Sequence, residues 1–211
     1  MLFALKLRLP INFVVKRTIF KQFCGGETIS ECAPTIKALG SQGIGTILDY
    51  SVEGKTQEDD FDKTTAIIID TIKKAKQEKN IPFAVFKITG ISQFSLLEKA
   101  SDKEIELSEK ELAELAKVEE RILNICKTAY KLNVPVFIDA EESWIQDIID
   151  TWAFEMMCLF NKERTIVYNT IQMYRHDRLK FLKSCVQKAV DKKVNYGVKL
   201  VRGAYMEKER E

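Results

Sequence analysis

Five short runs of apolar and β-branched residues alternate along the chain with longer segments of helical periodicity. The runs are almost continuously apolar, which is typical of strands that are buried on both faces. These predicted strands lie at Ile44–Leu48, Phe83–Ile88, Val134–Ile138, Thr165–Ile171 and Gly197–Val201.

Four of the intervening segments predict amphipathic helices, and the clearest covers Glu109–Leu132. Its apolar residues recur at steps of three and four and form a single stripe. Ser108 and Glu111 have the spacing of a capping box, and Pro135 follows the end of the helix. The other three apolar faces run from Phe61 to Ala75, from Ile145 to Leu159 and from Leu179 to Ala189.

Strands that alternate with helices pair in parallel through crossovers, in either a doubly wound sheet or a (β/α)₈ barrel. The sequence has no Gly-x-Gly-x-x-Gly motif, and Gly43 and Gly45 precede the first strand instead of following it. A complete barrel has eight strands in about 250 residues. The five strands counted here are therefore either part of such a barrel or evidence against one, and both architectures predict an α/β fold of parallel strands that alternate with helices.

Composition and charge exclude several classes of function. The formal net charge is only +2, so no nucleic-acid partner is expected. The five cysteines are odd in number and form no C-x-x-C pair, which predicts reduced, mostly buried thiols without a disulfide or zinc site. His176 is the only histidine, so the chain offers no histidine metal cluster and no Ser-His-Asp triad.

The first 23 residues are basic and apolar, with no acidic residue before Glu27. A targeting peptide is one interpretation, but Pro10 interrupts the apolar run and no small-residue cleavage site follows. We favour an amphipathic helix packed on the domain, with an interfacial membrane helix as the alternative. No stretch reaches the roughly 18 uncharged residues that a membrane span needs.

Polar residues follow every predicted strand at its carboxyl end, where both architectures place their chemistry. Any single charge there fits a solvated loop equally well, but Lys87 and Lys199 lie inside apolar runs. A buried lysine needs a carboxylate or an anionic ligand nearby, and Asp139 and Glu141 are the candidate carboxylates. The polar segments are Asp49–Glu53, Lys87–Thr89, Asp139–Glu142, Gln172–Arg175 and Arg202–Tyr205.

Two chemistries fit these residues. Lys87 or Lys199 in an apolar strand is suited to a Schiff base with a carbonyl substrate, as in a barrel lyase. Alternatively, the lysines and arginines hold an anionic cofactor or a carboxylate substrate. Glu141 and Glu142 are adjacent on an extended segment and point to opposite faces, so they are poor partners for glycoside hydrolysis.

The strand-end motifs favour the second chemistry, because in chain order they resemble those of the proline dehydrogenase family. Lys199–Tyr205 is similar to the fifth-strand signature of that family, and Ile138–Glu142 is similar to the third. Leu48–Glu53, Phe86–Thr89 and Gln172–Tyr174 resemble the first, second and fourth motifs, and Phe20–Phe23 resembles the entry segment.

The resemblance implies a distorted (β/α)₈ barrel that holds FAD and oxidises L-proline. We therefore expect this chain to be an incomplete (β/α)₈ TIM-type barrel of five parallel strands alternating with helices. Residues 1–40 would form a helical entry segment and residues 41–211 the first five β/α units. A hydride passes from C5 of proline to flavin N5 and gives Δ1-pyrroline-5-carboxylate. The electrons go to a membrane quinone. The implied location is cytoplasmic and peripheral to the inner membrane, or mitochondrial in a eukaryote.

By motif position, the resemblance also implies residue roles. Asp139 would lie beside flavin and substrate and Lys199 near flavin N5, as catalytic residues. Lys87 and Tyr205 would contact the substrate, and Glu53 would be a gating acid. The implied cofactor-binding residues are Ala140, Gln172, Arg202, Gly203 and Ala204.

The chain departs from the family pattern in two respects. Many bacterial members have arginine where Lys199 stands, and a lysine keeps the charge but loses the forked donor geometry. The last three strands and the final helix are missing from these 211 residues. We therefore expect the chain alone to bind FAD poorly, to be weakly active or inactive, and to self-associate. The alternatives to a dehydrogenase are a non-catalytic remnant or interaction module, and a Schiff-base lyase.

Overall fold

The computed structural model describes residues 18, 20, 24–50, 57–205 and 209 of the chain. The chain divides into two compact units, Met1–Thr46 and Ile47–Glu211. The first unit contains helix α4 (Ile29–Gly40), which begins where the Thr28 hydroxyl accepts a hydrogen bond from the Glu31 backbone N–H. The predicted amino-terminal amphipathic helix lies almost entirely outside the described residues.

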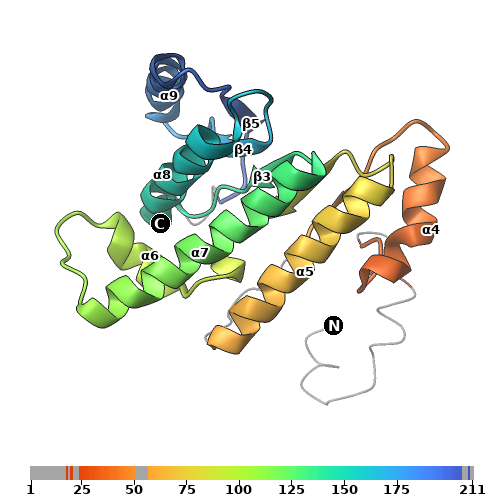
Figure 1. The fold of residues 1–211 in the computed structure, drawn as a ribbon, viewed down its shortest axis with the longest axis horizontal. Coiled ribbons are helices and arrows are strands. Elements are labelled where there is room, and N and C mark those ends of the chain that lie inside the picture. Colours follow the sequence, from red (N-terminus) through yellow and green to blue (C-terminus); the bar gives the residue numbers. More distant parts are fainter. Residues whose placement is uncertain (1–17, 19, 21–23, 51–56, 206–208, 210–211) are drawn as a thin grey trace. The chain divides into compact units, whose positions relative to one another are not determined.

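The second unit is built on a five-stranded sheet whose strand order follows the sequence, and every neighbouring pair is parallel (Figure 1). This arrangement confirms the predicted α/β fold of five parallel strands that alternate with helices. The strands are β1 (Ile47–Leu48), β2 (Phe83–Phe86), β3 (Val136–Ile138), β4 (Val167–Gln172) and β5 (Gly197–Val201).

The helices of this unit also follow the sequence pattern. In α7, Ser108 and Glu111 form the predicted capping box, and Asn133 ends the helix in the left-handed conformation. The short helix α6 was not predicted, because its eight residues are too few to display a period. The bounds are α5 (Glu58–Gln77), α6 (Phe94–Ser101), α7 (Glu109–Leu132), α8 (Ser143–Phe160) and α9 (Arg178–Lys192), with a 3₁₀ turn, η2, at Ile88–Gly90. No helix among the described residues is long and apolar enough to span a bilayer.

Three of the predicted strands, β1, β3 and β4, begin later than expected, and for β1 and β3 the cause is the end of the preceding helix. The first run was predicted from Ile44, but Ile44 is exposed, and its N–H bonds the Leu39 carbonyl at the end of α4. Val134 likewise donates to the Ala129 carbonyl and closes α7 before β3 begins. The ends of these helices therefore take up backbone groups that the apolar pattern assigned to strands.

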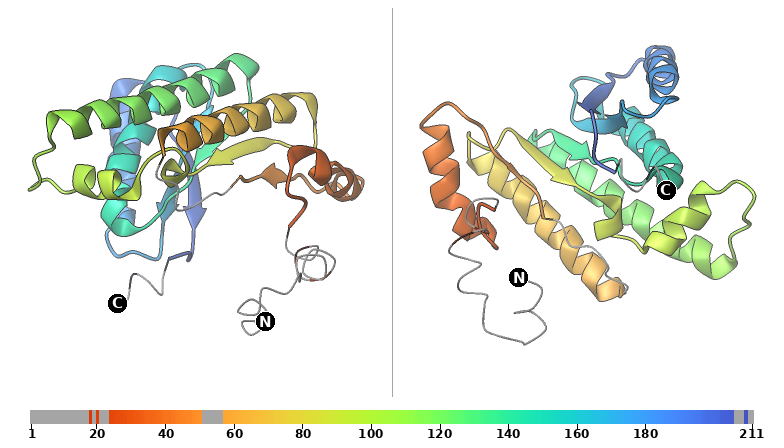
Figure 2. Two further views of the ribbon diagram at one scale, coloured as in Figure 1. Left: turned by 90° about the horizontal axis from the view of Figure 1, so that it is seen from below. Right: turned by 180° about the vertical axis from the view of Figure 1, so that it is seen from behind.

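The two faces of the sheet differ in their surroundings. The side chains of Ala84, Val136 and Val167 are fully buried, and helices α5 and α8 contact strands β2 and β4. In Figure 2, left, α5 and α7 lie side by side along the sheet. On the opposite face Phe83, Phe137 and Tyr168 are only half-buried, whereas Val85, Thr170 and Gln172 are buried, so the prediction of strands buried on both faces holds there only in part.

An aromatic cluster forms the floor of this half-buried face. The rings of Phe83 and Phe137 are stacked with centroids 4.5 Å apart, and Tyr168 meets both rings edge-on. Because side chains two residues apart on a strand point to the same face, Asp139 follows Phe137 and Thr170 follows Tyr168 on this side. The polar residues Asp139 and Thr170 therefore lie on the same side of the sheet as this aromatic cluster.

Candidate active site

Four polar side chains lie in one row across the carboxyl ends of the strands. Thr170 of β4 pairs directly with Lys199 of β5. Asp139 comes one residue after the pairing of Ile138 with Asn169, so it continues the row on β3. Lys87 comes one residue after Phe86, which pairs with Ile138, and it extends the row to β2. The parallel register therefore places Lys87, Asp139, Thr170 and Lys199 together.

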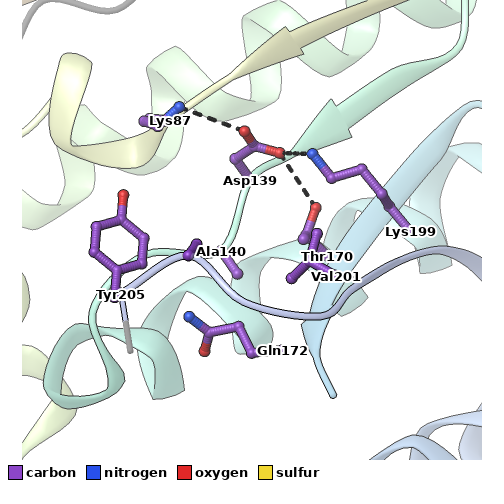
Figure 3. Close-up of a pocket in the computed structure, with 9 residues that line it drawn as sticks. Lys87, Asp139, Ala140, Thr170, Gln172, Lys199, Val201 and Tyr205 are labelled. Atoms are coloured by element: carbon purple, nitrogen blue, oxygen red, sulfur yellow. Dashed lines mark hydrogen bonds and ion pairs between the residues drawn. The ribbon is translucent and has the colours of Figure 1, made fainter. Parts of the chain in front are cut away.

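Asp139 is the centre of this row (Figure 3). Its Oδ2 accepts a hydrogen bond from Lys87 Nζ at 3.4 Å, and its Oδ1 accepts one from the Thr170 hydroxyl at 3.4 Å. The same Oδ1 forms a close ion pair with Lys199 Nζ. A half-buried carboxylate thus neutralises the lysines of two other strands, as expected for lysines in apolar runs.

Lys87 has a second carboxylate partner that the sequence analysis did not assign. Its Nζ lies 3.4 Å from Oδ2 of Asp49, which directly follows β1. Burial lowers the pKa of Lys87, but the charges and hydrogen bonds of Asp49 and Asp139 outweigh this, and the net shift is upward. Lys87 is therefore protonated at neutral pH, whereas a Schiff-base lysine must present a neutral amine.

Glu141 does not pair with either lysine. Its carboxylate accepts hydrogen bonds from the Thr89 backbone N–H at 3.1 Å and from the Thr89 hydroxyl. The side chain is buried, and this desolvation raises the pKa of Glu141 to about 7 against the opposing effect of the Thr89 hydrogen bonds. Of the two carboxylates predicted to face a lysine, Asp139 does so, and Glu141 instead ties the end of β3 to the turn after β2.

Gln172 is buried at the end of β4 and links the same loops. Its Nε2 donates to the Glu141 backbone carbonyl and, at 2.9 Å, to the Tyr174 hydroxyl. Its Oε1 accepts from Arg175 at 3.3 Å. The amide is thereby held in one orientation beside the cavity.

A cavity of about 220 Å³ opens at this end of the sheet. Seven of the predicted site residues line it, together with Thr170 and Val201, which the sequence analysis did not single out. Arg202 and Gly203, which lie in the sequence between β5 and Ala204, are exposed, and Glu53 lies outside the described residues. The seven are Lys87, Asp139, Ala140, Gln172, Lys199, Ala204 and Tyr205.

A comparison with known protein families identifies the family of this chain. The family model described as "Proline dehydrogenase" matches residues 32–211. The chain belongs to the proline dehydrogenase family. The expected resemblance is confirmed over nearly the whole sequence.

Three curated relatives each match most of this chain. The chain is 33% identical to proline dehydrogenase 1, mitochondrial, of Dictyostelium discoideum, over 98% of this chain and 43% of that protein. It is 34% identical to proline dehydrogenase 1, mitochondrial, of Arabidopsis thaliana, over 93% of this chain and 47% of that protein. It is also 33% identical to the carbapenem antibiotics biosynthesis protein CarD of Pectobacterium carotovorum, over 89% of this chain and 50% of that protein. The chain thus spans about half the length of these curated relatives.

A solved structure shares the fold. Proline utilization A from Bdellovibrio bacteriovorus, inactivated by N-propargylglycine, superposes with a TM-score of 0.77 at 18% identity. The match covers 95% of this chain and 22% of that protein. The alternating strands and helices of this chain therefore match part of the fold of that protein.

Proposed function

We propose that this chain carries the flavin- and proline-contacting strands of an enzyme that oxidises L-proline to Δ1-pyrroline-5-carboxylate. FAD held at this cavity would supply a hydride acceptor, its N5, for the hydride on C5 of proline, and a membrane quinone would take up the electrons. The observation that carries the proposal is the convergence of Lys87 and Lys199 on Asp139 at the rim of one cavity in a chain of this family.

The substrate carboxylate is assigned to Lys87. This lysine is protonated, partly buried and directed at the cavity, which suits it to bind a carboxylate in a fixed orientation. Tyr205 lines the same cavity and gives the proline ring a surface to pack against.

Lys199 and Gln172 are assigned to the flavin ring. A flavin gains negative charge on reduction, and a fixed cation such as Lys199 stabilises that charge. Lys199 Nζ also lies 5.3 Å from the centroid of the Phe137 ring, which restricts where the ammonium can move. Both N–H donors of the Gln172 amide are engaged, whereas its Oε1, which accepts from Arg175, has a second lone pair to offer to the ring edge.

The segment after β5 is assigned to the rest of the cofactor. Arg202, Gly203 and Ala204 are exposed, so their main chain is accessible to a ligand. Arg202 adds a positive charge suited to a diphosphate, and Gly203 has no side chain to hinder close approach. Together with the cation and amide in the cavity, this donor set fits FAD.

A Schiff-base lyase is disfavoured by the same geometry. Both lysines are held as ammonium partners of Asp139, and the pKa of Lys87 is raised instead of lowered. Borohydride trapping with keto acids should therefore yield no adduct on Lys87 or Lys199.

The test of the proposed function compares two proteins. One is the chain alone, and the other is the chain joined to the part of the Dictyostelium relative that lies beyond the match. We expect the joined protein to be yellow and to reduce an artificial electron acceptor when given L-proline. We expect the chain alone to bind FAD weakly and to have little activity. A joined protein that binds FAD but ignores proline would contradict the proposal.

A further inference from the structure

Lys87 is shared between two carboxylates that differ in exposure. Its Nζ lies 3.4 Å from an oxygen of each aspartate, Asp49 and Asp139. The Asp139 side chain is only 17% exposed, and its other oxygen is engaged by Thr170 and Lys199. The Asp49 side chain is 41% exposed, so water can reach its contact with Lys87.

The formal charges of this cluster cancel. Lys87 and Lys199 contribute two positive charges, and Asp49 and Asp139 contribute two negative charges. A ligand carboxylate that approaches Lys87 is therefore repelled by Asp49 while Asp49 remains beside the lysine. Once Asp49 turns to solvent, the remaining three groups carry one positive charge, which a ligand carboxylate balances.

We propose that Asp49 is a resident counter-ion of Lys87 that the carboxylate of an amino-acid substrate displaces on binding. Asp49 acts through Lys87 and is a positioning residue. Without substrate, Asp49 balances the charge of the partly buried Lys87 ammonium. When substrate is present, Asp49 competes with the substrate carboxylate for that ammonium. The inference rests on the proposed function for the identity of the substrate, but its geometry concerns any small carboxylate.

This role predicts the opposite sign from a supporting salt bridge. If Asp49 only held Lys87 in place, its removal would weaken carboxylate binding. If Asp49 competes with the ligand, Asp49→Asn removes a repulsive charge and strengthens carboxylate binding. At a separation of about 5 Å and an effective dielectric constant of about 40, the gain is roughly tenfold.

The experiment titrates the full chain with three probes and follows the NMR signals of isotope-labelled lysine side chains. L-proline and cyclopentanecarboxylate both carry a carboxylate, whereas L-prolinamide does not. The Lys87 signal is identified by its absence in Lys87→Arg. In Asp49→Asn we expect about tenfold tighter binding of both carboxylates and no tighter binding of prolinamide.

A matched control removes the same charge elsewhere. Asp70 forms an exposed ion pair with Lys73 on α5, and Asp70→Asn should leave all three affinities unchanged. As a second readout, the pKa of Lys87 should fall in Asp49→Asn, because one of the carboxylates that raise it is lost. A change of fold stability alone would not separate carboxylate from amide ligands.

Equal or weaker carboxylate binding by Asp49→Asn would overturn the proposal, as would a Lys87 signal that no carboxylate shifts in either protein. The outcome is separable from that of the proposed function. If the joined protein fails to oxidise proline while Asp49→Asn still binds cyclopentanecarboxylate more tightly, the function fails and the counter-ion role stands.

Discussion

At the scale of single residues, the convergence of Lys87, Asp139 and Lys199 was predictable and the partners Asp49 and Thr170 were not. Lysines inside apolar strands require a carboxylate, and the ends of parallel strands share one rim of a sheet, so the sequence predicts their meeting. The contact of Asp49 with Lys87 depends on side-chain placement after a strand of only two residues. Nothing in the sequence distinguishes Thr170 from other strand residues, and only the register of the strands places it beside Asp139.

Glu141 makes the stability of the chain depend on pH. The pKa of Glu141 is about 7 in the folded chain, above the value of 4.5 in the unfolded chain. The contribution of the neutral Glu141 carboxyl to the stability of the fold is therefore present below pH 4.5 and is lost as the pH rises through about 7. Against Glu141→Gln, the wild-type chain should lose up to about 3 kcal/mol of relative stability across that interval. Denaturant unfolding at a series of pH values measures the difference, and parallel pH curves for both proteins would refute the assignment.

At the scale of elements, the sequence predicts the alternation of strands and helices well and their ends less well. Long amphipathic periods and capping residues identify α7, because its apolar stripe and its Ser108 cap are local features. The start of β1 was misplaced, because apolar Ile44 lies between the end of α4 and the strand and not in the sheet. Such boundaries depend on which backbone groups a neighbouring element satisfies.

A buried aspartate joins three elements on the helix-covered side of the sheet. The carboxylate of Asp150 on α8 accepts hydrogen bonds from Asn169 on β4 and from Arg178 on α9, each at 2.8 Å, and a third from Gln146 within α8 at 2.9 Å. Asp150→Ala leaves these buried donors without that acceptor, and we expect a loss of about 3 kcal/mol in unfolding free energy.

The control for this prediction is Asp147→Ala, which removes an exposed carboxylate from the same helix. Its effect should stay within about 0.5 kcal/mol. Chemical denaturation followed by circular dichroism measures both variants. If the two variants were destabilised equally, Asp150 would not hold these elements together.

At the scale of the whole molecule, apolar side chains lie exposed at the outer side of the sheet. β5 is an edge strand of the described sheet, and Leu200 on it is 55% exposed. On α9, Leu179, Val186 and Val190 are also exposed at spacings that place them along one flank of the helix. An unpaired parallel edge with apolar neighbours favours association between chains.

We therefore expect concentration-dependent self-association of the chain, weakened by the pair of substitutions Val190→Lys and Leu200→Lys. Light scattering coupled to size-exclusion chromatography measures the mass. The control is Leu112→Lys on α7, which adds charge at an exposed leucine of another helix and should leave association unchanged. Equal effects of the control and the pair would show that added charge, and not this edge, governs association.

The most direct test of the central claim asks whether the cavity binds flavin and proline together. The protein joined to the Dictyostelium segment is loaded with FAD and titrated anaerobically with L-proline while the flavin absorbance is recorded. We predict that proline bleaches the oxidised flavin, and that Lys87→Met needs at least about tenfold more proline for the same bleaching while its flavin content is unchanged. A bound flavin that stays oxidised with saturating proline, or a Lys87→Met protein with an unaltered titration, would contradict the account.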